Sequence, residues 1–280
     1  MDIDRIYHLS SQPPPVEDWS RIGEGREALF ISRASLPLPP PATLAHLTEI
    51  WTFELDRASL ESLLSACRPA ILNIQRSHIA DLSFLTAQTS LRALAIDWNN
   101  KVSSLDFLLG MGRLEALSLV DLKHVHDLRP LSGLGELRAL QIAGGMYTKI
   151  EPDTLKPLAG LAKLEDVRLA NIKIRDGSLE SLASLPALKT LTIASNAASL
   201  EQFARLSARL PHVACDQFQP YMRMDGKPLR RGADPAGELD RIGDIEVMVT
   251  GKGMPVLRAR RDRSRLLRYC ERFGAAQRSD

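Results

Sequence analysis

The chain has 280 residues, of which 44% are apolar and 25% are charged, and its formal net charge is only +2. This balance is typical of a globular protein with a large core. No stretch approaches eighteen consecutive apolar residues, and the first fifteen residues contain two aspartates and no apolar run. We therefore expect neither a membrane span nor a signal peptide, and we expect the protein in the cytoplasm.

The cysteine content is low and irregular. Cys67, Cys215 and Cys270 are odd in number, far apart and outside any CxxC pattern. This spacing argues against a disulfide framework and against a cysteine metal site. We interpret all three as buried thiols.

Residues 1–46 are predicted to form an N-terminal cap that contains a degenerate first repeat. The proline-rich stretches PPP and LPLPPP are typical of an irregular segment that covers a neighbouring element. Between them, Leu29 and Ile31 alternate with other residues in EALFIS, which indicates one weak strand.

Residues 47–217 contain a repeated pattern, LxxLxL. Its strict copies follow one another at steps of 23, 23, 27 and 24 residues, and they are LRALAI at Leu91, LEALSL at Leu114, LRALQI at Leu137, LEDVRL at Leu164 and LKTLTI at Leu188. Weaker copies in the same phase are LTEIWT, PAILNI and LPHVAC. The second and third apolar positions alternate with period two, which predicts a strand with one buried face.

The remainder of each unit has a different period. In DLRPLSGLGELRAL the apolar residues Leu128, Leu131, Leu134 and Leu137 recur every three residues, which is the period of a 3₁₀ helix. Neither the strand nor the return can bury its apolar face alone, so consecutive units must stack. Leu117 and Leu140 are interpreted as core residues of this stack.

This pattern resembles the leucine-rich repeat proteins, in particular the repeat class of internalins and of a protein phosphatase regulatory subunit. The resemblance covers residues 47–217 and implies an α/β solenoid, with parallel strands on the concave face, 3₁₀ or short helices on the convex face and caps at both ends. The asparagine that bonds the turn backbone in that family is present only as Asn99 and Asn196; other strict units have Leu122, Gly145 and Ile172 there. Their turns must close in other ways.

The strand alternation also predicts which side chains the concave face displays. Aromatic residues, with Phe30 the first of them, gather in the first half of the array beside polar side chains, a combination typical of binding hot spots. The predicted partner-binding residues are Trp51, Phe53, Gln75, Arg76, Asp97, Trp98, Asp121, Gln141 and Arg168. Alternatively, Phe30, Trp51 and Phe53 pack under the N-terminal segment; Trp98 lies deeper in the array, where a cap reaches less easily.

The 27-residue unit carries about four extra residues in AGGMYTKIEPD. Gly144 and Gly145 open a wider loop, with Met146 and Tyr147 predicted at its tip. Such a loop is either an interaction site or an insertion that the repeat tolerates without a role.

Residues 218–280 are predicted to form a C-terminal cap made of a hairpin and a helix. After a loop at residues 222–238, DIEVMVT and MPVLRA flank the turn GKG, and RDRSRLLRYCERFGAAQR follows with Leu266, Leu267, Cys270 and Phe273 on one face. Six arginines lie between Arg258 and Arg268. They raise the alternative of nucleic-acid binding through phosphates, but without aromatic residues between them we favour a solvated face that pairs with Asp262 and Glu271.

No motif for catalysis or cofactor binding is present in the sequence. His124 and His126 form an HxH pattern, but they flank the buried Val125 of a convex return, so we expect both to point outward without a metal. The family resemblance then implies a cytoplasmic, non-catalytic module that binds another protein on its concave face. A narrower alternative is a bacterial immunity or regulatory protein that neutralises one toxin or enzyme.

Overall fold

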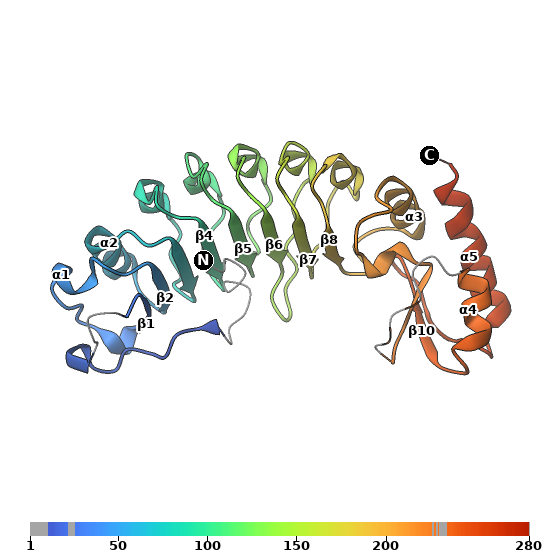
Figure 1. Ribbon diagram of the computed structural model, residues 1–280, viewed down its shortest axis with the longest axis horizontal. Coiled ribbons are helices and arrows are strands. Elements are labelled where there is room, and N and C mark those ends of the chain that lie inside the picture. Colours follow the sequence, from blue (N-terminus) through green and yellow to red (C-terminus); the bar gives the residue numbers. More distant parts are fainter. Residues whose placement is uncertain (1–10, 22–25, 226, 228, 230–233, 280) are drawn as a thin grey trace.

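The computed structural model describes residues 11–21, 26–225, 227, 229 and 234–279. Figure 1 shows an arch whose concave side is lined by a parallel sheet of eight strands in chain order, with the returns on the convex side. The strands are β1 (Ala28–Ser32), β2 (Glu49–Phe53), β3 (Ile71–Gln75), β4 (Ala93–Asp97), β5 (Ala116–Val120), β6 (Ala139–Ala143), β7 (Asp166–Ala170) and β8 (Thr190–Ile193).

The register of the sheet follows the predicted repeat phase. Leu94 on β4 pairs with Leu72 on β3 and with Leu117 on β5, so equivalent leucines lie side by side along the array. These leucines, Leu140 included, are fully buried and belong to one continuous apolar core. The prediction of stacked strands with one face in the core is confirmed.

Most returns on the convex side are short 3₁₀ helices, as the three-residue period predicts. They are η5 (Ser83–Ala87), η6 (Asp106–Leu108), η7 (Arg129–Gly133), η8 (Lys156–Leu158) and η9 (Glu180–Ser184). Near the two ends of the array the returns are ten-residue α-helices, α2 (Arg57–Ala66) and α3 (Leu200–Arg209). Each helix has an N-cap side chain, Asp56 or Ser199, that accepts a hydrogen bond from the backbone N–H of the third helical residue.

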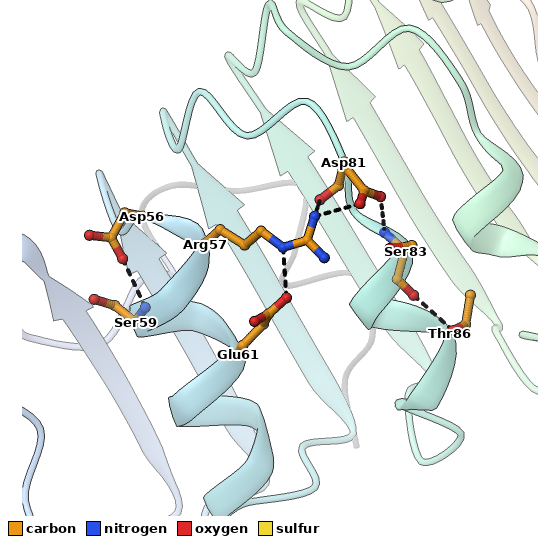
Figure 2. Close-up of polar contacts among 7 residues, drawn as sticks. All are labelled: Asp56, Arg57, Ser59, Glu61, Asp81, Ser83 and Thr86. Carbon is orange, nitrogen blue, oxygen red and sulfur yellow. Dashed lines mark hydrogen bonds and ion pairs between the residues drawn. The ribbon is translucent and has the colours of Figure 1, made fainter.

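Polar contacts join the wide helix α2 to the narrow return that follows it (Figure 2). The Arg57 guanidinium donates to the Glu61 carboxylate at 2.7 Å and to the Asp81 backbone oxygen at 3.1 Å. Asp81 in turn accepts a hydrogen bond from the backbone of Ser83, the first residue of η5, at 2.8 Å. The guanidinium also donates to the Asp81 carboxylate at 2.5 Å, and this hydrogen bond, together with those from Ser83, lowers the pKa of the Asp81 carboxyl to about 2. These contacts therefore join the α-helix α2 to the 3₁₀ helix η5 on the convex surface.

The N-terminal part of the chain closes the first edge of the sheet. It contains η3 (Trp19–Arg21), η4 (Arg33–Ser35) and α1 (Pro41–Leu44). Pro15 forms a parallel bridge with Phe30 of β1, and the Val16 backbone donates to the Phe30 oxygen at 2.9 Å. Because β1 continues the sheet into β2, no break separates the expected cap at residues 1–46 from the repeats.

The C-terminal part begins where the repeats lose their strands. The last weak copy, at Leu210 and Val213, has buried apolar residues but contributes one bridge, Ala214 with Thr190, and no strand. A short helix, η10 (Asp216–Phe218), leads into an antiparallel sheet of β9 (Tyr221–Arg223), β10 (Glu246–Val249) and β11 (Val256–Arg258).

The predicted hairpin, β10 with β11, and the predicted final helix, α5 (Arg263–Gln277), are confirmed. The loop expected at residues 222–238 is wrong at both ends, because β9 occupies its start and α4 (Pro235–Arg241) its end; residues 226, 228 and 230–233 lie outside the described residues. Helix α5 packs against α3, and Gln277 donates to the Ser207 hydroxyl at 2.8 Å. The end of the apolar core is therefore covered.

Candidate functional site

The concave face is closed in its first half and open in its second half. The row of side chains at the centre of the strands runs through Trp51, Asn73, Ala95 and Ser118, all of them buried. The same row continues through Gln141 and Arg168, which are half-buried, to Thr192, which is exposed. Solvent therefore reaches the concave side chains from about β6 onward.

Trp51 is on the predicted face but is not displayed. Its side chain is fully buried, and its indole Nε1 donates to the Glu49 carboxylate at 2.8 Å. Phe30 is also buried and meets Phe53 edge to face, with ring centroids 6.3 Å apart. The prediction that Trp51 is displayed is therefore wrong. The alternative is that Phe30, Trp51 and Phe53 pack under the N-terminal segment; Phe30 and Trp51 are buried, but Phe53 is only half-buried.

Gln75 and Asp97 are also buried, and the prediction that they are displayed is wrong. They are register partners on β3 and β4, and Asn73 lies two residues before Gln75 on the same face. Both polar atoms of the Asn73 amide, the Gln75 nitrogen and one Asp97 oxygen have no hydrogen-bond partner among the described residues. Burial raises the pKa of the Asp97 carboxyl to about 7. We call these three residues the buried polar cluster.

The repeat pattern alone does not predict this burial. Strand alternation assigns a side chain to a face of the sheet, but it does not determine whether another part of the chain covers that face. Ile71, Ala93, Ala95, Ala116 and Ala139 form a second apolar cluster on the concave side of β3–β6. In Figure 1 the described N-terminal residues, in dark blue, lie on the concave side of the arch.

A second row of residues follows the carboxyl ends of the strands. In this row the backbone N–H groups of the first five members donate to the next strand at 2.8–2.9 Å, and five members have positive φ angles between 45° and 56°. We call the row the carboxyl rim; its members are Glu54, Arg76, Trp98, Asp121, Gly144 and Asn171. Trp98 is half-buried there.

Near the start of the carboxyl rim, three side chains form a partly exposed cluster. The Arg76 guanidinium lies 5.5 Å from the centroid of the half-buried Phe53 ring, and its Nε lies 3.4 Å from the Glu54 carboxylate. These contacts hold Arg76 at the rim with about half of its side chain exposed. Phe53 and Arg76 therefore remain accessible to a partner.

The other predicted residues are divided between the rim and the open half. Asp121 accepts a hydrogen bond from the Thr148 hydroxyl across the loop of the 27-residue unit. The Arg168 guanidinium pairs with the Asp166 carboxylate at 2.7 Å and remains half-buried beside Gln141. A groove between β8 and β9, lined by residues such as Thr192, Cys215 and Tyr221, continues this open surface toward the cap. Periodicity gave no signal for the groove, because a non-repeating element forms one wall.

The comparisons with known proteins agree with this architecture. Internalin C2 of Listeria monocytogenes is similar, with a TM-score of 0.50, 23% identity and coverage of 62% of this chain and 72% of that chain. The chain has the leucine-rich repeat fold. Two further similar structures are an internalin (inlF) of Listeria monocytogenes, with a TM-score of 0.26, 15% identity and coverage of 69% and 80%, and the leucine-rich repeat domain of the type III effector XopL, with 0.35, 19%, 68% and 67%. No protein family and no curated protein matches the chain significantly.

The turns of the leucine-rich repeats close in three ways. Asn99 is fully buried, and its side-chain nitrogen donates to the backbone oxygen of Ile79 at 2.9 Å, as expected for the turn asparagine. Where that asparagine is missing, Leu122 and Ile172 are buried apolar residues instead. At Gly145, side chains of the carboxyl rim supply the bonds, since Asn171 donates to the Gly145 oxygen at 2.9 Å.

Among the described contacts, three of the six arginines from Arg258 to Arg268 lie within ion-pair distance of acidic residues. Arg263 contacts Asp240 at 2.8 Å, Arg261 contacts Asp262 at 3.4 Å, and Arg258 lies 3.9 Å from Asp244. Such pairing supports the interpretation of this tail as a charged protein surface rather than a phosphate-binding stripe. The expected partner Glu271 has no arginine within ion-pair distance among the described contacts; Arg272 pairs with Glu201 of α3 instead.

The histidines within the described ranges do not belong to a metal site. There, no group of three or more His, Cys, Asp or Glu side chains is arranged to hold a metal ion. His126 is half-buried and its Nδ1 lies 2.8 Å from the Glu151 backbone oxygen, so only His124 points fully outward. None of the described helices is both long enough and apolar enough to cross a bilayer.

Proposed function

We propose that this protein binds another protein on a surface that joins the carboxyl rim to the open half of the concave face. The observation that supports this most is the change from buried side chains at Trp51 and Ser118 to exposed ones at Thr192 along a single row of the sheet. A repeat array holds such a surface rigidly, and extended concave surfaces of this kind suit the recognition of folded partners. Binding, rather than catalysis, accounts for the surface.

The composition of the surface fits a protein partner. The rim supplies the partly exposed aromatic residues Phe53 and Trp98 with Arg76, and tryptophan, tyrosine and arginine are the residues most often found in binding hot spots. The open half supplies small or polar side chains, Gln141, Ala170 and Thr192, which allow a partner to approach the strands closely. We therefore place the main anchor at Trp98 and the complementary surface around β6–β8.

Two substitutions test the two parts of this surface. Trp98→Ala removes a hot-spot side chain and is expected to weaken the complex about 30-fold, the effect of about 2 kcal/mol. Thr192→Arg adds bulk to an exposed site and is expected to block a partner without disturbing the core. Ser184→Arg, on the exposed convex return η9, is the matched control and should bind normally.

The measurement is the affinity of each purified variant for a partner isolated on the wild-type chain. Circular dichroism melting curves should show that all three variants fold. If Trp98→Ala and Thr192→Arg both bind as tightly as Ser184→Arg, the proposed surface is wrong.

A further inference from the structure

The loop of the 27-residue unit displays two large side chains almost completely to solvent. Met146 is 82% exposed and Tyr147 is 93% exposed, the highest values for large apolar side chains among the described residues. The loop leaves the carboxyl rim at Gly144 and rejoins the array at Ile150, which bridges to Ile172. It is therefore continuous with the surface proposed above.

The base of this loop is held by hydrogen bonds from three directions. The Thr148 hydroxyl donates to the Asp121 carboxylate and accepts from the Gly145 N–H at 3.0 Å. The Asn171 amide donates to the Gly145 oxygen at 2.9 Å. Asp121 and Asn171 belong to the rim positions on either side of the loop, so both neighbouring units fix its base.

The glycines at the base fit tightly into this arrangement. A Cβ atom on Gly145 would lie 2.6 Å from the Asp121 carboxyl carbon, and one on Gly144 would collide with the backbone oxygens of Thr148 and Asn171. A side chain at either position would force the base apart. The base is thus a closely packed structure, whereas an insertion without a role needs no such fit.

A preformed loop binds with a smaller ordering cost than a flexible one. Tyrosine and methionine are enriched at the centres of protein interfaces, because both bury a large apolar area and adapt to a pocket. The tip therefore has the composition of an anchor that inserts into an apolar pocket.

The position of the loop indicates the shape of its partner. In Figure 1 the loop descends from between β6 and β7 on the concave side, and the N-terminal part and the C-terminal cap both extend further on that side. A flat bilayer would meet those two ends before it reached the tip. A rounded surface that enters the arch would reach it.

We propose that the loop is a preformed anchor, and that its ligand is a folded protein whose convex lobe enters the arch and receives Met146 and Tyr147 in an apolar pocket. This inference rests on the proposed function, since it places the second anchor of the same partner two rim positions after Trp98. The loop is the part of the surface that selects partners by the presence of that pocket.

A photo-crosslinking experiment tests the position of the anchor. Tyr147→p-benzoylphenylalanine should give one adduct, of the mass of this chain plus one other protein, in an extract of cells that make the protein. Leu109→p-benzoylphenylalanine is the control, because Leu109 is 57% exposed at the end of the convex return η6. The proposal is overturned if no adduct forms at position 147, if position 109 gives the same adduct in equal yield, or if the adduct has twice the mass of this chain.

Affinity measurements with the isolated partner test the anchor and its support separately. Tyr147→Ala should weaken binding about 30-fold, and Leu109→Ala should leave it unchanged. Thr148→Val keeps the shape of the side chain but removes the hydroxyl that holds the base, so it should weaken binding several-fold through a looser loop. Normal binding by Tyr147→Ala overturns the inference.

The outcomes separate the two proposals. If Trp98→Ala and Thr192→Arg lose the partner while Tyr147→Ala retains it, the proposed function remains and the anchor is rejected. If all variants bind normally, both are rejected. Tyr147-dependent sedimentation of the purified chain with vesicles of phosphatidylcholine and phosphatidylglycerol would overturn the protein partner in favour of a lipid surface.

Discussion

At the end of β4, a carboxyl group lies in a position where solvent barely reaches it. Asp97 is 6% exposed, and its neighbours in the buried polar cluster, Asn73 and Gln75, contribute amide atoms that also lack partners. A buried polar atom without a hydrogen bond costs about 1–3 kcal/mol. The cluster therefore lowers the stability of the array at a position where small apolar side chains surround it.

Asp97 should make the stability of the protein depend on pH. Its pKa is about 7 in the folded chain and close to 3.9 in an unfolded one, so the folded state holds the proton more tightly. The contribution of Asp97 to the free energy of unfolding should be greatest below pH 4, fall as the pH rises from 4 to 7, and then level off, for a total on the order of 4 kcal/mol. Asp97→Asn should remove this fall.

Urea unfolding of both proteins at pH 5 and pH 8 measures the effect. Because other carboxyl groups also titrate, the informative quantity is the difference between wild type and Asp97→Asn at each pH. A difference that does not grow between pH 5 and pH 8 contradicts the raised pKa.

For individual residues, the sequence predicts the face of the sheet but not the burial of the side chain. Period two placed Trp51, Gln75 and Asp97 on the concave face, and the sheet register agrees. The same period carries no information about what else covers that face, so it could not predict their burial. Trp98 was easier to interpret, because its place in the carboxyl rim follows directly from the strand before it.

At the scale of the repeat unit, the strands share one core. Truncation of a buried leucine on a central strand leaves a cavity there that side chains of the adjacent units do not fill. Leu117 on β5 and Leu140 on β6 are fully buried and pair with each other. Leu117→Ala or Leu140→Ala should lower the free energy of unfolding by about 2–5 kcal/mol. Thr192→Ala, at an exposed site on β8, should change it by less than about 0.5 kcal/mol. Equal unfolding curves for all three variants would show that the core phase is wrong.

The elements that the sequence predicted are those with a repeated pattern. Five strict LxxLxL copies gave strands, and the three-residue period gave 3₁₀ returns, because each unit supports the next. The elements β9 and α4 were missed, since the stretch between Tyr221 and Arg241 is rich in glycine, proline and charge and has no periodicity. Short elements of that kind depend on contacts with the rest of the fold.

At the scale of the whole molecule, the arch has two differently closed ends. Pro15 and Val16 extend the first edge of the sheet, whereas α5 covers α3 at the other end through Phe273 and Leu266, which are buried. In a repeat array each unit contacts only its neighbours, so the loss of a cap should affect the nearest unit first.

Phe273→Ala tests this local dependence. The cavity should cost about 3–5 kcal/mol within the C-terminal cap, because a large buried ring is lost. Hydrogen exchange followed by mass spectrometry should then show faster exchange in α3 and β8 than in wild type, while β3–β5 keep their protection. Uniformly faster exchange along the whole array would instead indicate a single cooperative unit.

The 27-residue unit differs in length from its neighbours, yet the strands on both sides of it keep their register. A change of length at one step is therefore absorbed at the rim and leaves the other units in place. Recognition in such a protein is modular: a new loop, inserted between two rim positions, could redirect the partner without any change to the core. The same property makes the exposed tip, at Met146 and Tyr147, a natural place to graft a different binding sequence.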